Sequence, residues 1–419
     1  MEQGSSTDSD IQNKVEKALE GIGLGISSLE KLSGGSVNWI YVAKLKRRLE
    51  DGTLEVLVKH AESYMASKPD FPLPSLRCAV EVESLKILLG IQTSSWSDSY
   101  NFIARTPRLY DFDAKGLNQL IELQSKGINL KDYAIQKFRS PTPQYLEPQC
   151  YALGKALGRW LKDFTEWSSQ QTDHRELIAQ NEFAQTVRHM VNYHWLHKRI
   201  EEFPSVLDDV RAILEDVEKT AVAQLKENDK LHIVHGDFWT GNIVLPNEPF
   251  EKVCETPLFV VDWEMSHLSH PSVDFGEMIA EMYALWLYKS IDGGLWMMDG
   301  FIDGYGEVNE EFAFRTAVHV ERLQAYFDIR LAGKQQKNGD RNNIVVMDKE
   351  SISISAMGSK GIKYVSTNED GQLILSGHSH GLFYGDLKKN FLAQGHPGES
   401  DGVQVTQTDG YGEEWEFVR

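Results

Sequence analysis

One polar string between two apolar runs limits what this chain can fold into more than any other feature. The string extends from His235 to Asn242 and reads HGDFWTGN, and the apolar run Ile243-Val244-Leu245 follows it at once. A second apolar run, Leu258-Phe259-Val260-Val261, ends at Asp262. Short apolar runs bounded by polar residues predict the two strands of a hairpin. Such a hairpin would bring the polar string and Asp262 to one end of a small sheet.

The polar side chains of this predicted hairpin have the chemistry that phosphoryl transfer needs. The carboxylate of Asp237 could orient an attacking hydroxyl and accept its proton. Asn242 and Asp262 offer oxygen atoms, which are the ligands that Mg²⁺ prefers. An isolated Asp and Asn would be a chance pair, whereas the whole string between two strands favours a catalytic site.

The same residues resemble a known family. The pattern His-Gly-Asp, four residues, Asn, and then Asp262-Trp263-Glu264 is similar to the motifs of the aminoglycoside phosphotransferase superfamily, which includes choline kinase and methylthioribose kinase. These are small-molecule kinases with a protein-kinase-like fold. The resemblance implies that Asp237 is the catalytic base and that Asn242 and Asp262 bind Mg²⁺. It covers roughly residues 25–330.

Protein kinases proper carry different versions of these motifs, namely His-Arg-Asp, Asp-Phe-Gly and Ala-Pro-Glu. This chain has Gly236 in place of the arginine and Trp263-Glu264 after the aspartate that resembles the metal ligand. No Ala-Pro-Glu sequence follows. The small-molecule branch is therefore favoured.

Periodicity divides the chain into three parts. Residues 1–123 combine strand-like segments with a helix near 77–89, as expected for an antiparallel N-lobe that binds a nucleotide. Residues 124–335 are mainly helical and carry the predicted hairpin. Residues 336–419 shift to Gly, Ser, Asn, Asp and Gln, so we expect an atypical polar segment that is partly disordered. The expected fold class is α+β, a bilobal protein-kinase-like fold.

Composition is typical of a soluble protein, with 41% hydrophobic and 25% charged residues among 419. No apolar run approaches the roughly 20 residues that cross a bilayer, and the polar N-terminus does not resemble a signal peptide. The three cysteines, Cys78, Cys150 and Cys254, lie far apart, which argues against a disulfide framework. We therefore expect a cytoplasmic protein with no membrane partner.

A glycine pair lies between two strand-like segments, in Ser33-Gly34-Gly35-Ser36. An ordinary hairpin turn would account for it, but the backbone amides of such a loop can also hold nucleotide phosphates. The longer string from Leu32 to Tyr41 is similar to the phosphate loop of methylthioribose-kinase-like proteins. This similarity favours a nucleotide-binding role for Gly35 and Ser36. The loop is not a Walker loop, because Gly-Lys-Ser/Thr is absent.

Lys59 ends the apolar run Val56-Leu57-Val58. A lysine at such a place is often only the solvated end of a strand, but in kinases it pairs with the nucleotide phosphates and with a helix glutamate. The string Val58-Lys59-His60-Ala61 looks like that family element. We expect Glu83 to be the partner, because apolar residues follow it as in the family pattern. Glu81 is the alternative, and it would point to a different face of the helix.

Three further positions complete the expected site. Glu122-Leu123-Gln124 follows a predicted strand and precedes helical sequence, so it is expected to be the hinge whose backbone groups read the adenine. His235 is expected to order the catalytic loop by hydrogen bonds, and Asp274 to cap a helix or brace a loop. Three late histidines are interpreted as solvated residues, not metal ligands: His378, His380 and His396.

Recognition of the acceptor is the least defined part. Glu277 and Glu281 lie with Tyr283 and Trp286 on a predicted helix after the metal motif. Acidic and aromatic groups could bind an ammonium group, although a helix with one wet and one buried face would show the same pattern. The net charge of −19 would attract a cation and disfavours nucleic acid as a partner. A cationic acceptor is therefore favoured, with a neutral sugar such as methylthioribose as the alternative.

Together these features predict an enzyme. We expect an O-phosphotransferase that uses ATP and Mg²⁺ to phosphorylate a hydroxyl of a small, cationic metabolite or drug-like molecule. The alternative is a kinase-like binding or regulatory protein with weak catalysis. The presence of Lys59, Asp237, Asn242 and Asp262 argues against that alternative. The sequence does not indicate an oligomeric state.

Overall fold

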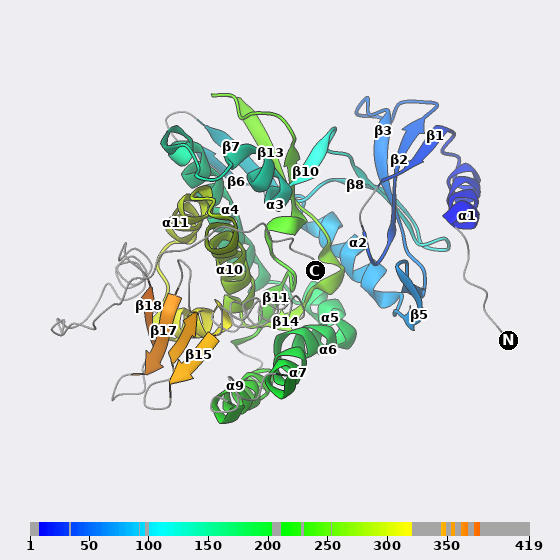
Figure 1. The fold of residues 1–419 in the computed structure, drawn as a ribbon. Coiled ribbons are helices and arrows are strands. Elements are labelled where there is room, and N and C mark those ends of the chain that lie inside the picture. Colours follow the sequence, from blue (N-terminus) through cyan, green and yellow to red (C-terminus); the bar gives the residue numbers. More distant parts are fainter. Residues whose placement is uncertain are drawn as a thin grey trace.

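The computed structural model describes most of residues 8–320 and four short strands beyond them. Within 8–320 the residues that it does not describe are 33–34, 92, 97–99, 203–210, 228–229 and 253. The glycine-rich loop is therefore described only from Gly35 onwards, and the three late histidines lie outside the described residues. The fold is α+β and bilobal, as predicted (Figure 1).

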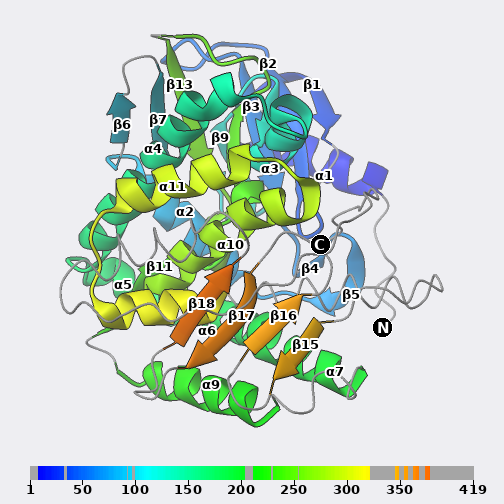
Figure 2. The ribbon, with the colours of Figure 1, turned by 60° about the vertical axis from the view of Figure 1, so that its left-hand side comes forward.

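An antiparallel sheet of five strands forms the N-terminal lobe, in the order β1-β2-β3-β9-β8. Its bounds are β1 Ile26–Lys31, β2 Trp39–Leu45, β3 Glu55–His60, β8 Leu109–Asp113 and β9 Asn118–Glu122. A turn at Asp51-Gly52 joins β2 to β3, and Gly52 has a φ of +88° there. Residues of α1, Asp8–Gly21, pack against this sheet through Ile11, Val15 and Leu19. Figure 2 shows α1 beside β1.

A second sheet carries the predicted motif hairpin and has the order β10-β12-β13-β7-β6. Its bounds are β6 Thr93–Trp96, β7 Asn101–Arg105, β10 Gly127–Asn129, β12 Ile243–Pro246 and β13 Glu255–Val260. The antiparallel pairing of β12 with β13 confirms the predicted hairpin. β7 pairs with β13 in parallel, which the sequence analysis did not predict. β6 and β7 therefore join the motif hairpin, although they fall within the predicted N-lobe range 1–123.

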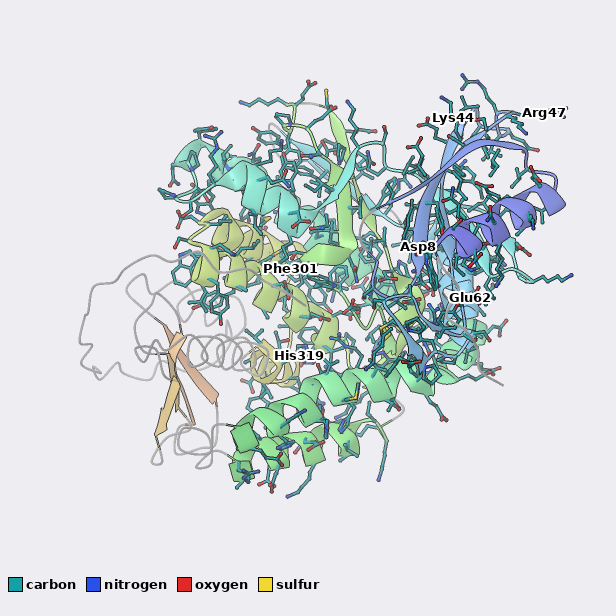
Figure 3. All side chains as sticks on the ribbon, turned by 45° about the vertical axis from the view of Figure 1, so that its right-hand side comes forward. Asp8, Lys44, Arg47, Glu62, Phe301 and His319 are labelled. Carbon is teal, nitrogen blue, oxygen red and sulfur yellow. The ribbon has the colours of Figure 1, made fainter. Side chains whose placement is uncertain are left out.

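Helices make up most of the rest of the described chain up to residue 320. The long helices are α2 Leu76–Leu88, α4 Glu147–Ser168, α9 Arg211–Gln224, α10 Ser272–Lys289 and α11 Gly293–Tyr305. The shorter ones are α3 Leu130–Tyr133, α5 Asp173–Ala179, α6 Glu182–His189 and α7 Trp195–Glu202. In Figure 3 Phe301 lies among the helices of the C-terminal lobe, whereas Lys44 and Arg47 lie at the outer end of the first sheet. Phe301 is fully buried and belongs to the large core that the helices and the second sheet share.

The described residues also form four two-stranded sheets. β4 Tyr64–Met65 pairs with β5 Lys68–Pro72, and β11 His232–Val234 pairs with β14 His267–Ser269. Beyond residue 320 the structure describes β15 Val345–Asp348, β16 Ser353–Ala356, β17 Ile362–Thr367 and β18 Leu373–Gly377. Among the helices that the structure describes, none has the length and apolar character needed to cross a membrane.

Candidate active site

The loop from His235 to Asn242 is fixed by the first turn of α10. The carboxylate of Asp274 accepts hydrogen bonds from the backbone N–H groups of His235, at 2.7 Å, and Gly236, at 2.9 Å. Burial raises the pKa of Asp274 to about 7, against the effect of these two donors. Asp274 is therefore a brace for the loop, one of the two roles expected for it, and not a helix N-cap.

The imidazole of His235 has a defined tautomer in this loop. Its Nε2 lies 2.9 Å from the carbonyl oxygen of Val261, and its Nδ1 accepts the backbone N–H of Asp237 at 3.2 Å. The ring therefore donates through Nε2 and is neutral. Burial lowers the pKa of His235 to about 4, which agrees with this assignment. The expected ordering role of His235 is seen in these two bonds.

Gly236 explains why this loop cannot carry the arginine of protein kinases. Its φ is +80°, and a Cβ atom there would overlap with the carbonyl oxygen of Met265. The ring of His267 would lie 2.7 Å from the same Cβ atom. Both the left-handed backbone and the lack of space require glycine at this position.

Asp237 accepts hydrogen bonds from three side chains. Its Oδ2 receives Trp239 Nε1 at 3.1 Å and Asn242 Nδ2 at 2.9 Å, both from the same loop. Its Oδ1 receives NH1 of Arg188 on α6 at 3.0 Å. The Asp237 side chain keeps 22% of its surface exposed. The carboxylate is thus oriented from both sides and still reaches the surface.

Asp262 and Lys59 join the two lobes. Asp262 follows β13 in a left-handed conformation, with φ +69° and ψ 58°, which aspartate tolerates better than most residues. Its Oδ1 lies 2.6 Å from Nζ of Lys59 on β3, and Glu81 on α2 lies 2.8 Å from the same nitrogen. Burial alone would lower the pKa of Lys59, but the charges of Asp262, Glu81 and Glu264 outweigh it and raise that pKa.

Glu264 extends this contact to the glycine-rich loop. The side chain is buried and accepts hydrogen bonds from Arg77 of α2 and from Nδ2 of Asn38, the latter at 3.0 Å. Arg77 also donates to Oδ1 of Asn38 at 2.7 Å. Asn38 lies three residues after Gly35, whose φ is +85°. The loop that follows Asp262, the start of α2 and the glycine-rich loop are therefore one hydrogen-bonded unit.

The acidic groups near Lys59 fit a divalent cation. Carboxylate oxygens of Glu81, Asp262 and Glu264 lie within 4.8 Å of one another. Hard oxygen donors of this kind suit Mg²⁺. Asn242 is linked to the same place, because its backbone oxygen accepts the N–H of Val261 at 3.0 Å. Since Asn242 donates through Nδ2, the group that it can offer to a cation is Oδ1.

Glu277 and Glu281, the two acidic residues of α10 expected near the acceptor, are buried and ion-paired. Glu277 is 1% exposed and lies 2.8 Å from NH2 of Arg188. Glu281 is 2% exposed and lies 3.8 Å from Nζ of Lys131. Lys131 also lies 5.2 Å from the centre of the Trp239 ring. The described contacts of both carboxylates are thus with cations of this chain.

Comparison with known proteins agrees with this geometry. The model of the phosphotransferase enzyme family, which includes the aminoglycoside phosphotransferases, matches residues 101–312, just over half of the chain. The chain belongs to this family. It is therefore a small-molecule kinase, and the resemblance that its motifs suggested is confirmed.

Similar proteins include a named phosphotransferase and a named kinase. A phosphotransferase named FrzJ from Cladobotryum sp is 28% identical over 70% of this chain and 79% of its own length. A 4-hydroxytryptamine kinase from Psilocybe cubensis is 21% identical over 74% of this chain and 83% of its own length. Among solved structures, an ethanolamine kinase from Plasmodium vivax is 14% identical, with a TM-score of 0.46, over 80% of this chain and 86% of that one.

The predicted partner of Lys59 in this phosphotransferase is wrong. Glu83 is partly exposed and pairs with Lys86, one turn further along α2, at 2.7 Å. Glu81 is the residue that faces Lys59, and it also accepts Nε2 of Gln119 from β9 at 2.9 Å. The apolar residues after Glu83 had suggested the opposite choice. Glu81 is buried, as are Val80 and Val82, but this burial is seen only in the folded chain.

At the predicted hinge the side chain of Glu122 forms hydrogen bonds with other residues of this chain. It forms two hydrogen bonds of 2.7 Å with Arg105 of β7 and accepts the backbone N–H of Arg108 at 3.0 Å. Arg105 also packs over the ring of Phe259 in β13, at 4.4 Å. Glu122 therefore ties the end of the first sheet to the second. Leu123 and Gln124 follow as partly exposed residues.

Sequence reasoning missed three polar residues of this phosphotransferase site: Asn38, Arg77 and Arg188. Asn38 lay inside the quoted glycine-rich string, so its position was available although its contact with Glu264 was not. Arg77 and Arg188 lie on helices and belong to no motif. Their partners are far away in the sequence, and only the folded chain brings them together.

Proposed function

We propose that this protein transfers the γ-phosphoryl group of ATP, with Mg²⁺, to a hydroxyl of a small amine-bearing molecule. The observation that carries the proposal is the ammonium group of Lys59 between Glu81 of α2 and Asp262 of the motif hairpin, at 2.8 and 2.6 Å. This arrangement joins both lobes at the place where a kinase aligns its nucleotide phosphates. Family membership supports the same chemistry.

In the proposed reaction each residue has one role. Asp237 orients the acceptor hydroxyl and takes its proton while the oxygen forms a bond to the γ-phosphorus. The bond from that phosphorus to the bridging oxygen breaks, and its electron pair leaves with ADP. Lys59 binds the nucleotide phosphates. Mg²⁺ held by Asn242 and Asp262 would neutralise charge on the phosphates when bound.

The other proposed contacts with the nucleotide come from the glycine-rich loop and from the hinge. Gly35 and Ser36 would contact the phosphates. The carbonyl oxygen of Ser36 is held by the N–H of Ser67 at 2.9 Å, which supports a loop of fixed shape. The backbone of Glu122, Leu123 and Gln124 would read the adenine. The Glu83 assignment is not retained, and Glu81 takes its place.

For the acceptor, two observations favour an amine. The net charge is −19, and relatives from two Psilocybe species are named for a tryptamine, which carries an amino group. Glu277 and Glu281 contribute negative charge beneath the site, but their pairing with Arg188 and Lys131 supports an indirect role. The amine would be attracted by the overall field and not by these two carboxylates alone.

The test begins with a panel of hydroxylated amines and neutral sugars, assayed with ATP and Mg²⁺ and including 4-hydroxytryptamine and methylthioribose. We expect turnover of an amine, and kcat/KM should fall as ionic strength rises, because salt screens the attraction.

Asp262→Ala should abolish turnover. Asp237→Asn should leave KM for ATP nearly unchanged and lower kcat by orders of magnitude. A neutral best substrate with a flat salt profile would refute the amine, and full activity of both variants would refute the mechanism.

A further inference from the structure

One guanidinium group connects the proposed base to a buried carboxylate of α10. NH1 of Arg188 donates to Oδ1 of Asp237 at 3.0 Å, and NH2 donates to Oε2 of Glu277 at 2.8 Å. The side chain of Arg188 is 11% exposed and that of Glu277 is 2% exposed. Both donors belong to one rigid, planar guanidinium group. The position of Glu277 therefore determines the position of Arg188, and hence that of the Asp237 carboxylate.

The direction from which Arg188 reaches Asp237 matters. The donors to Oδ2, from Trp239 and Asn242, belong to the catalytic loop and move with it. Arg188 comes from α6, so it fixes Oδ1 relative to the body of the C-terminal lobe. A base acts only when its oxygen lies within hydrogen-bond reach of the hydroxyl that loses the proton. Small errors in such a position can cost about a hundredfold in rate.

The burial of Glu277 shows that this is a built contact and not a surface pair. A buried carboxylate whose side chain is 2% exposed requires a partner, since an isolated buried charge is strongly unfavourable. An arginine can serve two carboxylates at once through its fork of donors, whereas lysine carries a single point charge. Asp237 and Glu277 thus bind the two terminal nitrogens of one guanidinium group.

We infer that Arg188 is a positioning residue of the phosphotransfer reaction, which holds the Asp237 carboxylate in place for the acceptor hydroxyl while Glu277 holds Arg188. This role rests on the proposed function of Asp237 as the base. Arg188 remains protonated throughout and exchanges no proton with the substrate. Glu277 acts through Arg188 and touches no reacting atom.

The experiment separates positioning from folding by using four variants: Arg188→Ala, Arg188→Lys, Glu277→Gln and the double variant Arg188→Ala/Glu277→Gln. For each we would measure the melting temperature, and kcat and KM for ATP, with 4-hydroxytryptamine as acceptor. Hydrolysis of ATP by water is measured in parallel, because it uses the same base. Arg315→Ala is the matched control. Arg315 is 12% exposed and also lies near two glutamates, Glu311 and Glu227, outside the site.

Arg188→Ala should lower kcat about a hundredfold while KM for ATP changes less than threefold. Its melting temperature should fall, because Glu277 is left buried without its cation. The double variant should recover the melting temperature but not kcat. Arg188→Lys should recover part of kcat, since it keeps the charge but loses the fork. Glu277→Gln should lose less than tenfold, and Arg315→Ala should keep the wild-type kcat.

Two outcomes would overturn the inference: wild-type kcat in Arg188→Ala, or recovery of kcat together with the melting temperature in the double variant. Failure of the proposed function gives a different pattern. In that case Asp237→Asn retains wild-type kcat, or the wild-type protein transfers phosphate neither to 4-hydroxytryptamine nor to methylthioribose. If Asp237→Asn is inactive and Arg188→Ala is fully active, only the role of Arg188 is refuted.

Discussion

The carboxylate of Glu81 holds two groups from two strands of the first sheet, Nζ of Lys59 at 2.8 Å and Nε2 of Gln119 at 2.9 Å. It is 2% exposed, and burial raises its pKa while Lys59 opposes that rise. The carboxylate therefore depends on its cation, and the cation on it. Glu83, two residues away, has an exposed partner of its own.

This difference gives a prediction with an internal control. Glu81→Gln should raise KM for ATP and lower kcat/KM at least tenfold, because Lys59 loses the charge that orients it toward the phosphates. Glu83→Gln should change kcat/KM less than twofold, since exposed ion pairs contribute little. Steady-state kinetics with varied ATP would measure both. Equal effects of the two changes would contradict the assignment of Glu81 as the partner of Lys59.

What the sequence could predict at this scale depends on how local the signal is. Asp237, Asn242 and Asp262 lie in or beside one hairpin, so their spacing alone brings them together. The choice between Glu81 and Glu83 required the rotation of a helix against a sheet, which neighbouring residues do not determine. The residues next to Arg188 in the sequence do not indicate its role, because both of its partners, Asp237 and Glu277, are distant in the sequence.

At the scale of elements, α4 and α11 pack through glycines on both helices. Gly154 and Gly158 of α4 face Met297 and Phe301 of α11, and a Cβ atom on either glycine would overlap with a backbone oxygen of the other helix. Gly300 and Gly304 of α11 show the same overlap with residues of α4. The spacing of four residues keeps the glycines on one face, which lets the two backbones touch. Figure 2 shows the two helices side by side.

Gly158→Ala should therefore lower the free energy of unfolding by about 3 kcal/mol, at the upper end of the usual effect of overpacking. The added methyl group would meet the backbone of Phe301 and cannot be relieved by a side-chain rotation. Gly21→Ala at the end of α1 is the control, because nothing lies within 4 Å of its Cβ position. Urea unfolding at equilibrium would measure both variants. A loss of less than 1 kcal/mol for Gly158→Ala would show that the helices can separate without cost.

The elements also show where prediction from sequence ends. The hairpin of β12 and β13 and the turn between β2 and β3 were predictable, because the paired runs are neighbours along the chain. The parallel pairing of β7 with β13 was not predictable. The two strands lie far apart in the sequence, and no pattern in either strand indicates that it pairs with the other. Local pattern identifies strands, whereas non-local pairing decides which sheet they join.

At the scale of the whole molecule, buried histidines make stability depend on pH. In the part of the chain that the structure describes, burial lowers the pKa of four histidines to about 4: His174, His235, His267 and His270. They are neutral in the folded chain, whereas in the unfolded chain they bind protons below about pH 6.5. Their contribution to stability is thus present above pH 6.5 and is lost as the pH falls toward 4. Asp274, with a pKa of about 7, acts in the opposite direction.

The four histidines outnumber the two buried carboxylates whose pKa is raised, Asp274 and Glu81, so the melting temperature should fall steadily between pH 6.5 and pH 4.5. Each proton bound only by the unfolded chain changes the free energy of unfolding by about 1.4 kcal/mol per pH unit. The opposite expectation follows from net charge alone, because repulsion should vanish near the pI of 5.2. Thermal unfolding at a series of pH values would decide between them. A maximum of stability near pH 5.2 would contradict the dominance of the histidines.

The route of the chain between the two sheets limits how such an enzyme can be recombined. Within residues 8–320 the chain leaves the first sheet after β3, enters the second for β6 and β7, returns for β8 and β9, and leaves again. A single crossover after residue 123 would combine β7 of one parent with β13 of another, along a shared row of backbone hydrogen bonds. An N-lobe exchanged between relatives would therefore have to be grafted as two separate sequence blocks, with the donor's β6 and β7 left behind.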